Sequence, residues 1–211
     1  MPTARSPSSK RNEAAEARIL DAAWRLYAEH GFEVPIGRIA RAARVTPAVF
    51  RRCFATKKAL LDRVFSKLFE GRWKPEWDAL LVNRALPLDQ RLTRFYVEYR
   101  GNIERNGARL WTRAGLLGLH KSGNFSATLA RRILNPMIFE LRHEAGVRSE
   151  RAVSGKEIEL AQVLHGAIAF PHTREHLFGM DVHGTLKEIV PMAVRVWLPG
   201  AKAEVRRLHR K

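Results

Sequence analysis

Apolar residues recur along most of this chain at the three- and four-residue spacing of an α-helix. In residues 13–30, Ile19, Ala23 and Tyr27 lie on one apolar stripe, and Gly31 follows as a helix stop signal. The short alternating runs of β-branched and polar residues that indicate strands are nearly absent. The pattern therefore predicts an all-α protein.

Three more short helices are expected before the first junction of the chain. Pro35 can open the second helix, and Thr46 followed by Pro47 is an N-cap with proline at the first helical position. Thr56 repeats this capping pattern for a fourth helix over residues 57–70.

Longer helices are expected beyond a junction near Gly71 and Pro75. The apolar periodicity predicts them near residues 76–85, 88–105, 108–120, 125–145, 155–178 and 184–198. Such a series of long, amphipathic helices is typical of a helical bundle.

The last two predicted helices are apolar on nearly every side. A helix of this kind is usually buried on two faces, one against its own subunit and one against a partner. We therefore interpret the pair as the interface of a homodimer, with ordinary core helices of a monomer as the alternative. The apolar stripe of the final helix consists of Leu186, Val190, Ala193, Val194 and Trp197.

Residues 38–54 have the spacing of a helix-turn-helix, in which the second helix enters the major groove of DNA. Such a helix needs apolar anchors on one face and hydrogen-bond donors on the other. Val45, Val49, Phe50 and Phe54 are the expected anchors. The residues expected to face DNA are Thr46, Pro47, Ala48, Arg51 and Arg52, with Arg38 outward on the preceding helix.

The charge of the chain favours a polyanionic partner, because 38 Lys and Arg against 21 Asp and Glu give a net charge of +17. An anionic lipid surface is an alternative partner that would also attract a chain of this positive charge. The single cysteine, Cys53, excludes a disulfide framework and a cysteine-cluster metal site. No apolar run is long enough to span a bilayer, so we expect a cytoplasmic protein with no membrane partner.

Residues 18–65 resemble the TetR family of bacterial transcriptional regulators. The resemblance rests on the ILDAA helix, the Gly31-Phe32 stop, the Ile39-Ala40 helix, the Val45-Thr46 cap and the lysine that opens the fourth helix. It implies about nine helices, with a three-helix DNA-binding domain followed by a larger helical bundle for ligand binding and dimerisation. It also implies repression that a small molecule relieves.

The resemblance assigns roles to single residues. Thr46 stands where the family's capping residue contacts a DNA phosphate, and Lys57 stands where a basic residue does likewise. Ala48 occupies a position that is usually small. Arg44 replaces a typical glycine of the turn, so the turn either adopts a less standard backbone or places Arg44 in the left-handed region with some strain. Arg51 replaces a typical phosphate-contacting tyrosine.

The expected domain organisation follows from these patterns. A disordered basic arm occupies residues 1–12, and the helix-turn-helix domain occupies residues 13–56. Residues 57–200 form the effector-binding and dimerisation domain, and residues 201–211 form a solvated basic tail.

Prolines at 136 and 171 interrupt two helical patterns, and a bent helix leaves space beside it. That space is a candidate effector pocket, with packed core as the alternative. Its candidate lining residues are Trp111, Phe139, His165, Phe170 and His172.

His172 and His176 share one helical face at a spacing that can bind zinc. No firm third ligand accompanies them, so we expect no metal site and no cofactor. The chain has no glycine-rich phosphate loop, nucleophile elbow or paired acid and base, which argues against an enzyme.

The sequence therefore predicts a DNA-binding transcriptional regulator, a homodimer on a palindromic double-stranded operator, with an unidentified small-molecule effector. The alternative is a similar fold that binds lipid or membrane in place of DNA. The intact segment from Thr46 to Lys57 favours the first interpretation.

Overall fold

The computed structural model describes residues 7–69, 73–102, 105–116 and 125–210, and all regular structure in these ranges is helical. The expected all-α class is thus confirmed. The chain divides into two compact units, one formed by residues 1–72 and 105–123 and the other by residues 73–104 and 124–211. None of the described helices is both long and apolar enough to cross a membrane.

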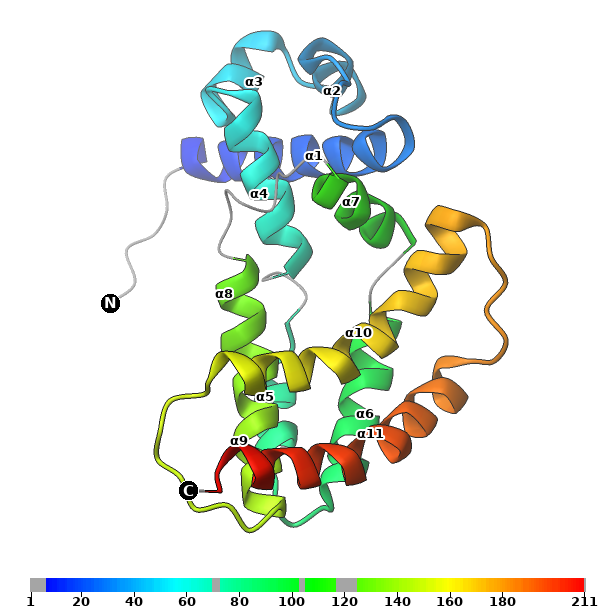
Figure 1. Ribbon diagram of the computed structural model, residues 1–211. Helices are drawn as coiled ribbons and strands as arrows, with labels where there is room; N and C mark the ends of the chain where they lie inside the picture. The colour runs from blue at the N-terminus through cyan, green and yellow to red at the C-terminus, as the bar shows by residue number, and fades with distance from the viewer. Residues whose placement is uncertain (1–6, 70–72, 103–104, 117–124, 211) are drawn as a thin grey trace. The chain divides into compact units, whose positions relative to one another are not determined.

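Unit 1 is built around the long first helix, whose predicted apolar stripe is buried at Ile19, Ala23 and Tyr27. The short helices of the unit pack their apolar residues against this stripe. Its helices are α1 (Pro7–His30), α2 (Ile36–Ala42), α3 (Pro47–Cys53), α4 (Lys57–Phe69) and α7 (Arg105–Leu116) (Figure 1).

Helix α7 is separated in sequence from the other helices of unit 1 by α5 (Pro75–Val82) and α6 (Leu88–Gly101), but it packs against α1. Leu110 and Ala114 are buried in the core of the unit. Arg113 Nη1 donates to the carbonyl oxygens of Tyr27 and Ala28, at 3.2 and 3.0 Å. These carbonyls belong to the last turn of α1, and the Tyr27 carbonyl also accepts a hydrogen bond from the Gly31 N–H at 3.0 Å. Unit 1 is thus larger than the DNA-binding domain expected over residues 13–56, whose functional limits remain a prediction.

The start of α1 differs from the expected disordered arm. The helix begins at Pro7, so half of the segment 1–12 is helical, whereas residues 1–6 lie outside the described residues. Proline is favourable in the first turn of a helix because its missing N–H is not needed there. The Asn12 carbonyl oxygen also lies 4.0 Å from Cys53 Sγ, which links this part of α1 to the end of α3.

Unit 2 holds the longer helices around a second, aromatic-rich core. Trp77, Phe95 and Tyr96 are among its fully buried side chains. Its elements are α5 (Pro75–Val82), α6 (Leu88–Gly101), α8 (Phe125–Leu129), a π-helical segment (Ala130–Leu134), α9 (Asn135–Glu144), α10 (Gly155–Phe178) and α11 (Leu186–Leu208).

The π-helical segment stands immediately before Pro136. Asn135 donates its backbone N–H to the carbonyl of Ala130, five residues earlier. Pro136 has no N–H and its ring would clash with the carbonyl four residues before it, so the wider turn accommodates the proline. The expected interruption of the helix over residues 125–145 is thus a local widening of the helix.

The C-terminal segment is not a separate solvated tail, contrary to expectation. Helix α11 continues into residues 201–211, and Ala201 and Val205 are buried in the core of unit 2. Arg206 Nε donates to the Ala145 carbonyl oxygen at 2.9 Å. The expectation was wrong because Pro199 and Gly200 were taken as the end of the helix. Ala201 and Val205 continue its four-residue apolar spacing beyond them.

Candidate nucleic-acid interface

The cap and the anchors of α3 lie where the sequence predicts them. Thr46 Oγ1 accepts a hydrogen bond from the backbone N–H of Val49 at 3.3 Å, and Pro47 occupies the first turn. Phe50 and Phe54 are buried in the core of unit 1, with ring centroids 6.1 Å apart. The buried rings fix the rotation of α3 about its axis and thereby select the face that remains outside.

The turn between α2 and α3 is a Schellman motif, the αL ending that usually carries glycine. The Val45 N–H donates to the Ala40 carbonyl at 3.0 Å, and the Arg44 N–H donates to the Arg41 carbonyl at 3.1 Å. Arg44 has φ 53°, in the left-handed region that is unfavourable for a residue with a Cβ atom. Of the two alternatives expected for this turn, the structure shows the left-handed Arg44.

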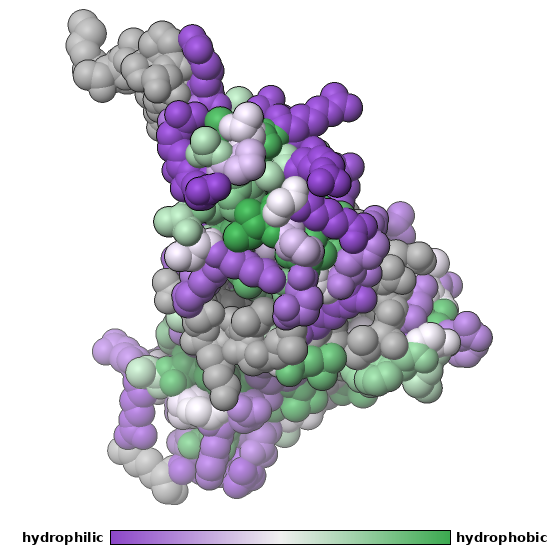
Figure 2. Space-filling view, turned by 90° about the horizontal axis from the view of Figure 1, so that it is seen from above, coloured by the Kyte–Doolittle hydropathy of each residue, from purple (hydrophilic) through white to green (hydrophobic). Residues whose placement is uncertain are grey.

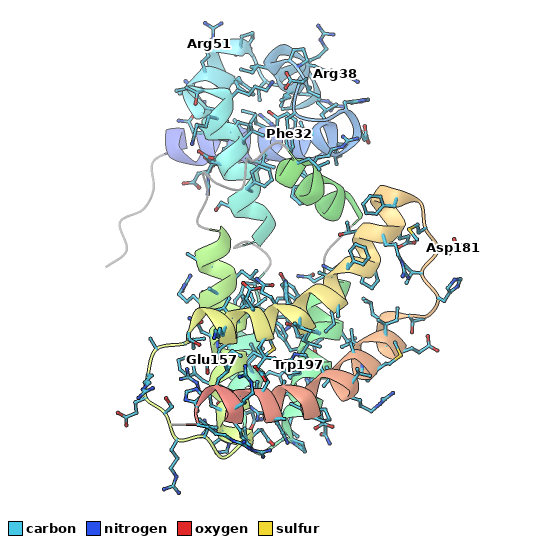
Figure 3. The ribbon with its side chains drawn as sticks, viewed as in Figure 1. Phe32, Arg38, Arg51, Glu157, Asp181 and Trp197 are labelled. Atoms are coloured by element: carbon cyan, nitrogen blue, oxygen red, sulfur yellow. The ribbon has the colours of Figure 1, made fainter. Side chains whose placement is uncertain are left out.

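The outer face of α2 and α3 is polar and strongly basic. Arg38 and Arg51 project outward from these helices, whereas Phe32 lies inside the unit (Figure 3). Figure 2 views this side and shows hydrophilic side chains gathered over it. The exposed residues that the sequence assigned to DNA contact are Arg38, Thr46, Pro47, Ala48, Arg51 and Arg52.

The arginines of this face are free to bind an anion. Arg51 and Arg52 form no ion pair with a described carboxylate. Arg38 Nη2 lies 2.9 Å from His30 Nε2, and Arg38 has no carboxylate partner among the described residues. An exposed guanidinium with unoccupied donors is suited to phosphate or to a guanine edge.

A second candidate position for an anion lies at the start of α4. Thr56 Oγ1 accepts from the Ala59 N–H at 3.0 Å, and the partly exposed Lys57 is the first residue of the helix. A helix N-terminus beside a lysine attracts a phosphate group through both the free N–H donors and the charge.

The predicted effector residues do not form one described pocket. Phe139 and Phe170 are 47% and 53% exposed. Trp111 belongs to α7 and His172 to α10, and their side chains lie outside the described residues. His165 is the predicted lining residue that lies against other polar groups of unit 2. The pocket therefore stays a prediction, with His165 as its best-supported member.

His165 sits in an aromatic cluster between α6 and α10. Its Nδ1 lies 3.3 Å from Tyr96 Oη, and its ring centroid lies 5.8 Å from that of Tyr96 and 6.3 Å from that of Tyr99. Burial, and secondly the positive charge of Arg100, lower the pKa of His165 to about 4. The imidazole is therefore neutral at pH 7.

Arg100 is a residue of this cluster that the sequence analysis missed. Its Nε atom is buried without a hydrogen-bond partner, and burial lowers the pKa of the guanidinium. An arginine in a helix of mixed polarity gives no sequence signal of burial, because burial depends on how the folded chain packs.

The structure also describes a hollow of about 820 Å³ at another place in unit 2. It lies between the loop that joins α9 to α10 and the end of α11, and its lining includes Arg148, Arg151, Arg206 and Arg210. None of the predicted effector residues lines it. Within the described ranges, no group of three or more His, Cys, Asp or Glu side chains could hold a metal ion. The His172 and His176 side chains lie outside those ranges.

The last two helices divide their apolar residues between the core and the surface. Val190, Val194 and Trp197, which the sequence analysis placed at a dimer interface, are buried within unit 2. This assignment was wrong for these three side chains, because the same helix has a second apolar face. The large apolar side chains that remain exposed on α10 and α11 are Val163, Phe170, Phe178, Met192 and Val196.

Comparisons with known proteins agree with the architecture of unit 1. A family model described as "Bacterial regulatory proteins, tetR family" matches residues 19–64, which cover the second half of α1, the helix-turn-helix and most of α4. Together with the exposed basic face, the match defines a helix-turn-helix protein of the DNA-binding class. Residues 19–64 thus match the N-terminal domain of the TetR family of bacterial regulatory proteins.

Solved structures share the fold over nearly the whole chain. A protein assigned to the TetR family of transcriptional regulators, from Mesorhizobium loti MAFF303099, is 14% identical, with 90% of this chain and 98% of that chain covered and a TM-score of 0.62. A protein assigned as a transcriptional regulator, from Rhodococcus sp. RHA1, is 19% identical, with 89% and 95% covered and a TM-score of 0.53. At these identities the likeness shows the fold. No curated protein matches the chain.

Proposed function

We propose that this protein is a sequence-specific, DNA-binding transcriptional regulator, a repressor that a small-molecule effector releases from a palindromic operator. The observation that carries the proposal is the outer face of α2 and α3, where arginines without carboxylate partners surround a capped helix N-terminus. Apolar anchors on the opposite face of α3 hold this surface in one orientation. The charge and the rigidity both suit the major groove.

The proposed contacts divide between the DNA backbone and the bases. The Thr46 oxygen accepts a bond from the helix N-terminus, so its hydroxyl proton remains available to a phosphate. Lys57 contacts a phosphate at the start of α4, and Arg38 contacts one from α2. Pro47 and Ala48 are small, which allows the backbone of α3 to approach the groove.

Arg51 and Arg52 act differently because adjacent residues of a helix point about 100° apart. Arg51, which replaces the family's phosphate-contacting tyrosine, contacts the backbone. Arg52 reaches a guanine edge, the base that arginine recognises best because two donors match its O6 and N7.

The proposed homodimer forms through the exposed apolar faces of α10 and α11. Val163 and Phe170 are seven residues apart on α10, and Met192 and Val196 are four apart on α11, so each pair lies on one helical face. A second copy of the chain would cover both faces in an isologous, twofold interface. The two recognition helices then contact half-sites about 34–36 Å apart or a groove-matched multiple of that distance.

The proposed effector acts on unit 2, with a coupling to DNA binding of about 1–3 kcal/mol. The neutral His165 and the Tyr96 hydroxyl supply hydrogen-bond groups within an aromatic setting, which is the usual composition of a small-molecule site. The proposal includes no catalysis and no cofactor, and it places the protein in the cytoplasm with the DNA.

Recovery of genomic DNA fragments by the purified protein, followed by sequencing, tests this function. The expected result is enrichment of one palindrome. The matched control is a variant that carries both Arg51→Ala and Arg52→Ala, and it should lose this enrichment. Uniform recovery of fragments by both proteins would contradict sequence-specific binding. If recovery were uniform and the protein also bound anionic lipid vesicles, lipid binding would replace sequence-specific DNA binding as the proposed function.

A further inference from the structure

Arginine side chains line the hollow of about 820 Å³ that lies beside the end of α11. Arg148 and Arg151 come from the loop between α9 and α10, whereas Arg206 and Arg210 come from the end of α11 and the residues after it. Among the described residues that line the hollow, Glu150 is the one carboxylate, and it forms no ion pair with a described residue. The four guanidinium groups and this carboxylate leave an excess of three positive charges.

Most of the hydrogen-bond donors on these arginines have no partner among the described residues. The Arg148, Arg151 and Arg210 side chains form no hydrogen bond or ion pair with a described residue. Arg206 donates its Nε–H to the Ala145 carbonyl oxygen at 2.9 Å, and no described residue accepts from its terminal N–H groups. The paired donors that a phosphate group would use are therefore open.

The two helix ends beside the hollow account for part of its charge. Helices α9 and α11 both end there, and each C-terminus carries about half a negative charge. The two ends together offset about one of the three excess positive charges. Arg207 neighbours Arg206 but does not line the hollow, and it pairs with Glu204 at 2.6 Å. The remaining positive charge of the hollow has no such carboxylate among the described residues.

One buried carboxylate, that of Glu157, holds both sides of the hollow in place. Arg142 Nη2 lies 2.7 Å from Glu157 Oε2, and Arg142 Nη1 donates to the Arg151 carbonyl oxygen at 2.7 Å. The other oxygen of Glu157 lies 2.9 Å from His209 Nε2. The loop and the end of α11 are thus tied to the same side chain. Donors on two fixed segments bind a ligand at a lower entropic cost than donors on mobile segments.

We infer that this hollow binds a small polyphosphate, a chain of two or three phosphate groups that is either free or part of a nucleotide. Guanidinium groups bind phosphate oxygens through paired, charge-assisted hydrogen bonds. Arginines on two segments can bind neighbouring phosphate groups of one chain, and about 820 Å³ is within the usual volume range of a small-molecule site. The inference goes beyond the proposed function and does not depend on DNA binding.

The phosphate chain should supply most of the affinity. The described residues that line the hollow include no Phe, Tyr or Trp side chain on which a nucleobase could stack. Tripolyphosphate should therefore bind about as tightly as ATP, and adenosine should not bind. Tighter binding of ATP than of tripolyphosphate would support the site and identify a nucleotide as the source of the phosphates.

Calorimetric titration of the full chain, at constant ionic strength, tests the inference. Tripolyphosphate should bind at least about tenfold more tightly than phosphate or citrate, because only the longer chain reaches the arginines of both segments. A variant with Arg148→Gln and Arg151→Gln should lose at least about tenfold in affinity for tripolyphosphate. The matched control, with Arg131→Gln and Lys187→Gln, removes two exposed cations of unit 2 that do not line the hollow, and it should bind as the wild type does.

Both variants replace exposed side chains, so their melting temperatures should stay within about 2 °C of the wild-type value and loss of folding does not explain lost binding. Equal losses of tripolyphosphate affinity in the two variants would indicate attraction to net charge alone and would overturn the inference. Wild-type protein that bound citrate as tightly as tripolyphosphate, or bound neither, would also overturn it.

DNA is the other polyanion that the hollow could contact. If Arg148→Gln with Arg151→Gln lowered the salt slope of binding to random duplex DNA by about two units but left tripolyphosphate binding unchanged, the hollow would be a DNA contact and the inference would fail. Selective tripolyphosphate binding by a protein that enriches no operator would support the site and contradict only the proposed function.

Discussion

Trp197 donates its indole N–H to the carbonyl oxygen of Leu160 at 3.0 Å, and this bond ties α11 to α10 within one subunit. Figure 3 shows Trp197 on the side of α11 that faces α10. The preceding residue, Val196, is 77% exposed. Neighbouring residues of one helix therefore have opposite environments, one in the core and one on the surface proposed for dimerisation.

Substitutions at these two positions should separate folding from dimerisation. Val196→Glu should give a folded monomer of 24.1 kDa, because a charge in the proposed interface lacks a partner. Trp197→Glu should instead destabilise the subunit by about 3–5 kcal/mol, because the ring is packed in the core. Light scattering gives the mass and urea unfolding gives the stability. A wild-type protein that is already monomeric at micromolar concentration would contradict the proposed dimer.

Arg44→Gly should stabilise unit 1 by about 1 kcal/mol, since glycine adopts the left-handed conformation of Arg44 without strain. The matched control is Arg41→Gly, which removes the same charge from within α2 and should destabilise by about 0.5–1 kcal/mol. Both are measured by thermal unfolding. Equal effects from the two variants would show that the backbone of Arg44 is not strained.

The helix-turn-helix could be predicted from the sequence because its signals are local. Thr46 and Pro47 define a helix start, and the anchors Phe50 and Phe54 follow at helical spacing. The structure confirms the cap, the buried anchors and the left-handed turn. Each of these features depends on residues within a few positions of one another.

The features that escaped prediction depend on contacts between distant segments. The burial of Arg100 depends on the tertiary packing around α6, and the continuation of α11 past Pro199 is stabilised by packing of Val205 in the core. Helical periodicity also could not tell which of two apolar faces of α11 meets its own subunit. That distinction needed the positions of Trp197 and Leu160 in space.

The stability of unit 2 should fall as the pH falls from 6.5 to 4, through His165. The folded pKa of about 4 lies below the usual value of 6.5, so the unfolded chain binds a proton more readily in this range. The stabilisation is fully present above pH 6.5 and decreases by about 3 kcal/mol as the pH approaches 4. Urea unfolding at several pH values should show a flatter profile for His165→Asn than for wild type. Parallel profiles would contradict the depressed pKa.

Thr46→Ala should lose both the cap and the proposed phosphate contact. The unfolding free energy should fall by about 1 kcal/mol, and affinity should fall alike on operator and random DNA. Thr46→Ser, which keeps the hydroxyl, should restore most of both properties. If serine restored stability without restoring affinity, the hydroxyl would not be the phosphate contact.

The most direct test of the central claim is a salt titration of binding by Arg51→Ala and Arg52→Ala, on the enriched operator and on a scrambled duplex of the same length. Arg51→Ala should weaken binding to both duplexes alike and reduce the salt slope by about one unit, as expected for a lost phosphate contact. Arg52→Ala should cost about 1–3 kcal/mol on the operator and much less on the scrambled duplex, because a base contact is lost. Identical behaviour of the two variants on both duplexes would contradict the division between backbone and base contacts. If neither substitution changed DNA binding, the exposed face of α3 would not be the surface that recognises DNA.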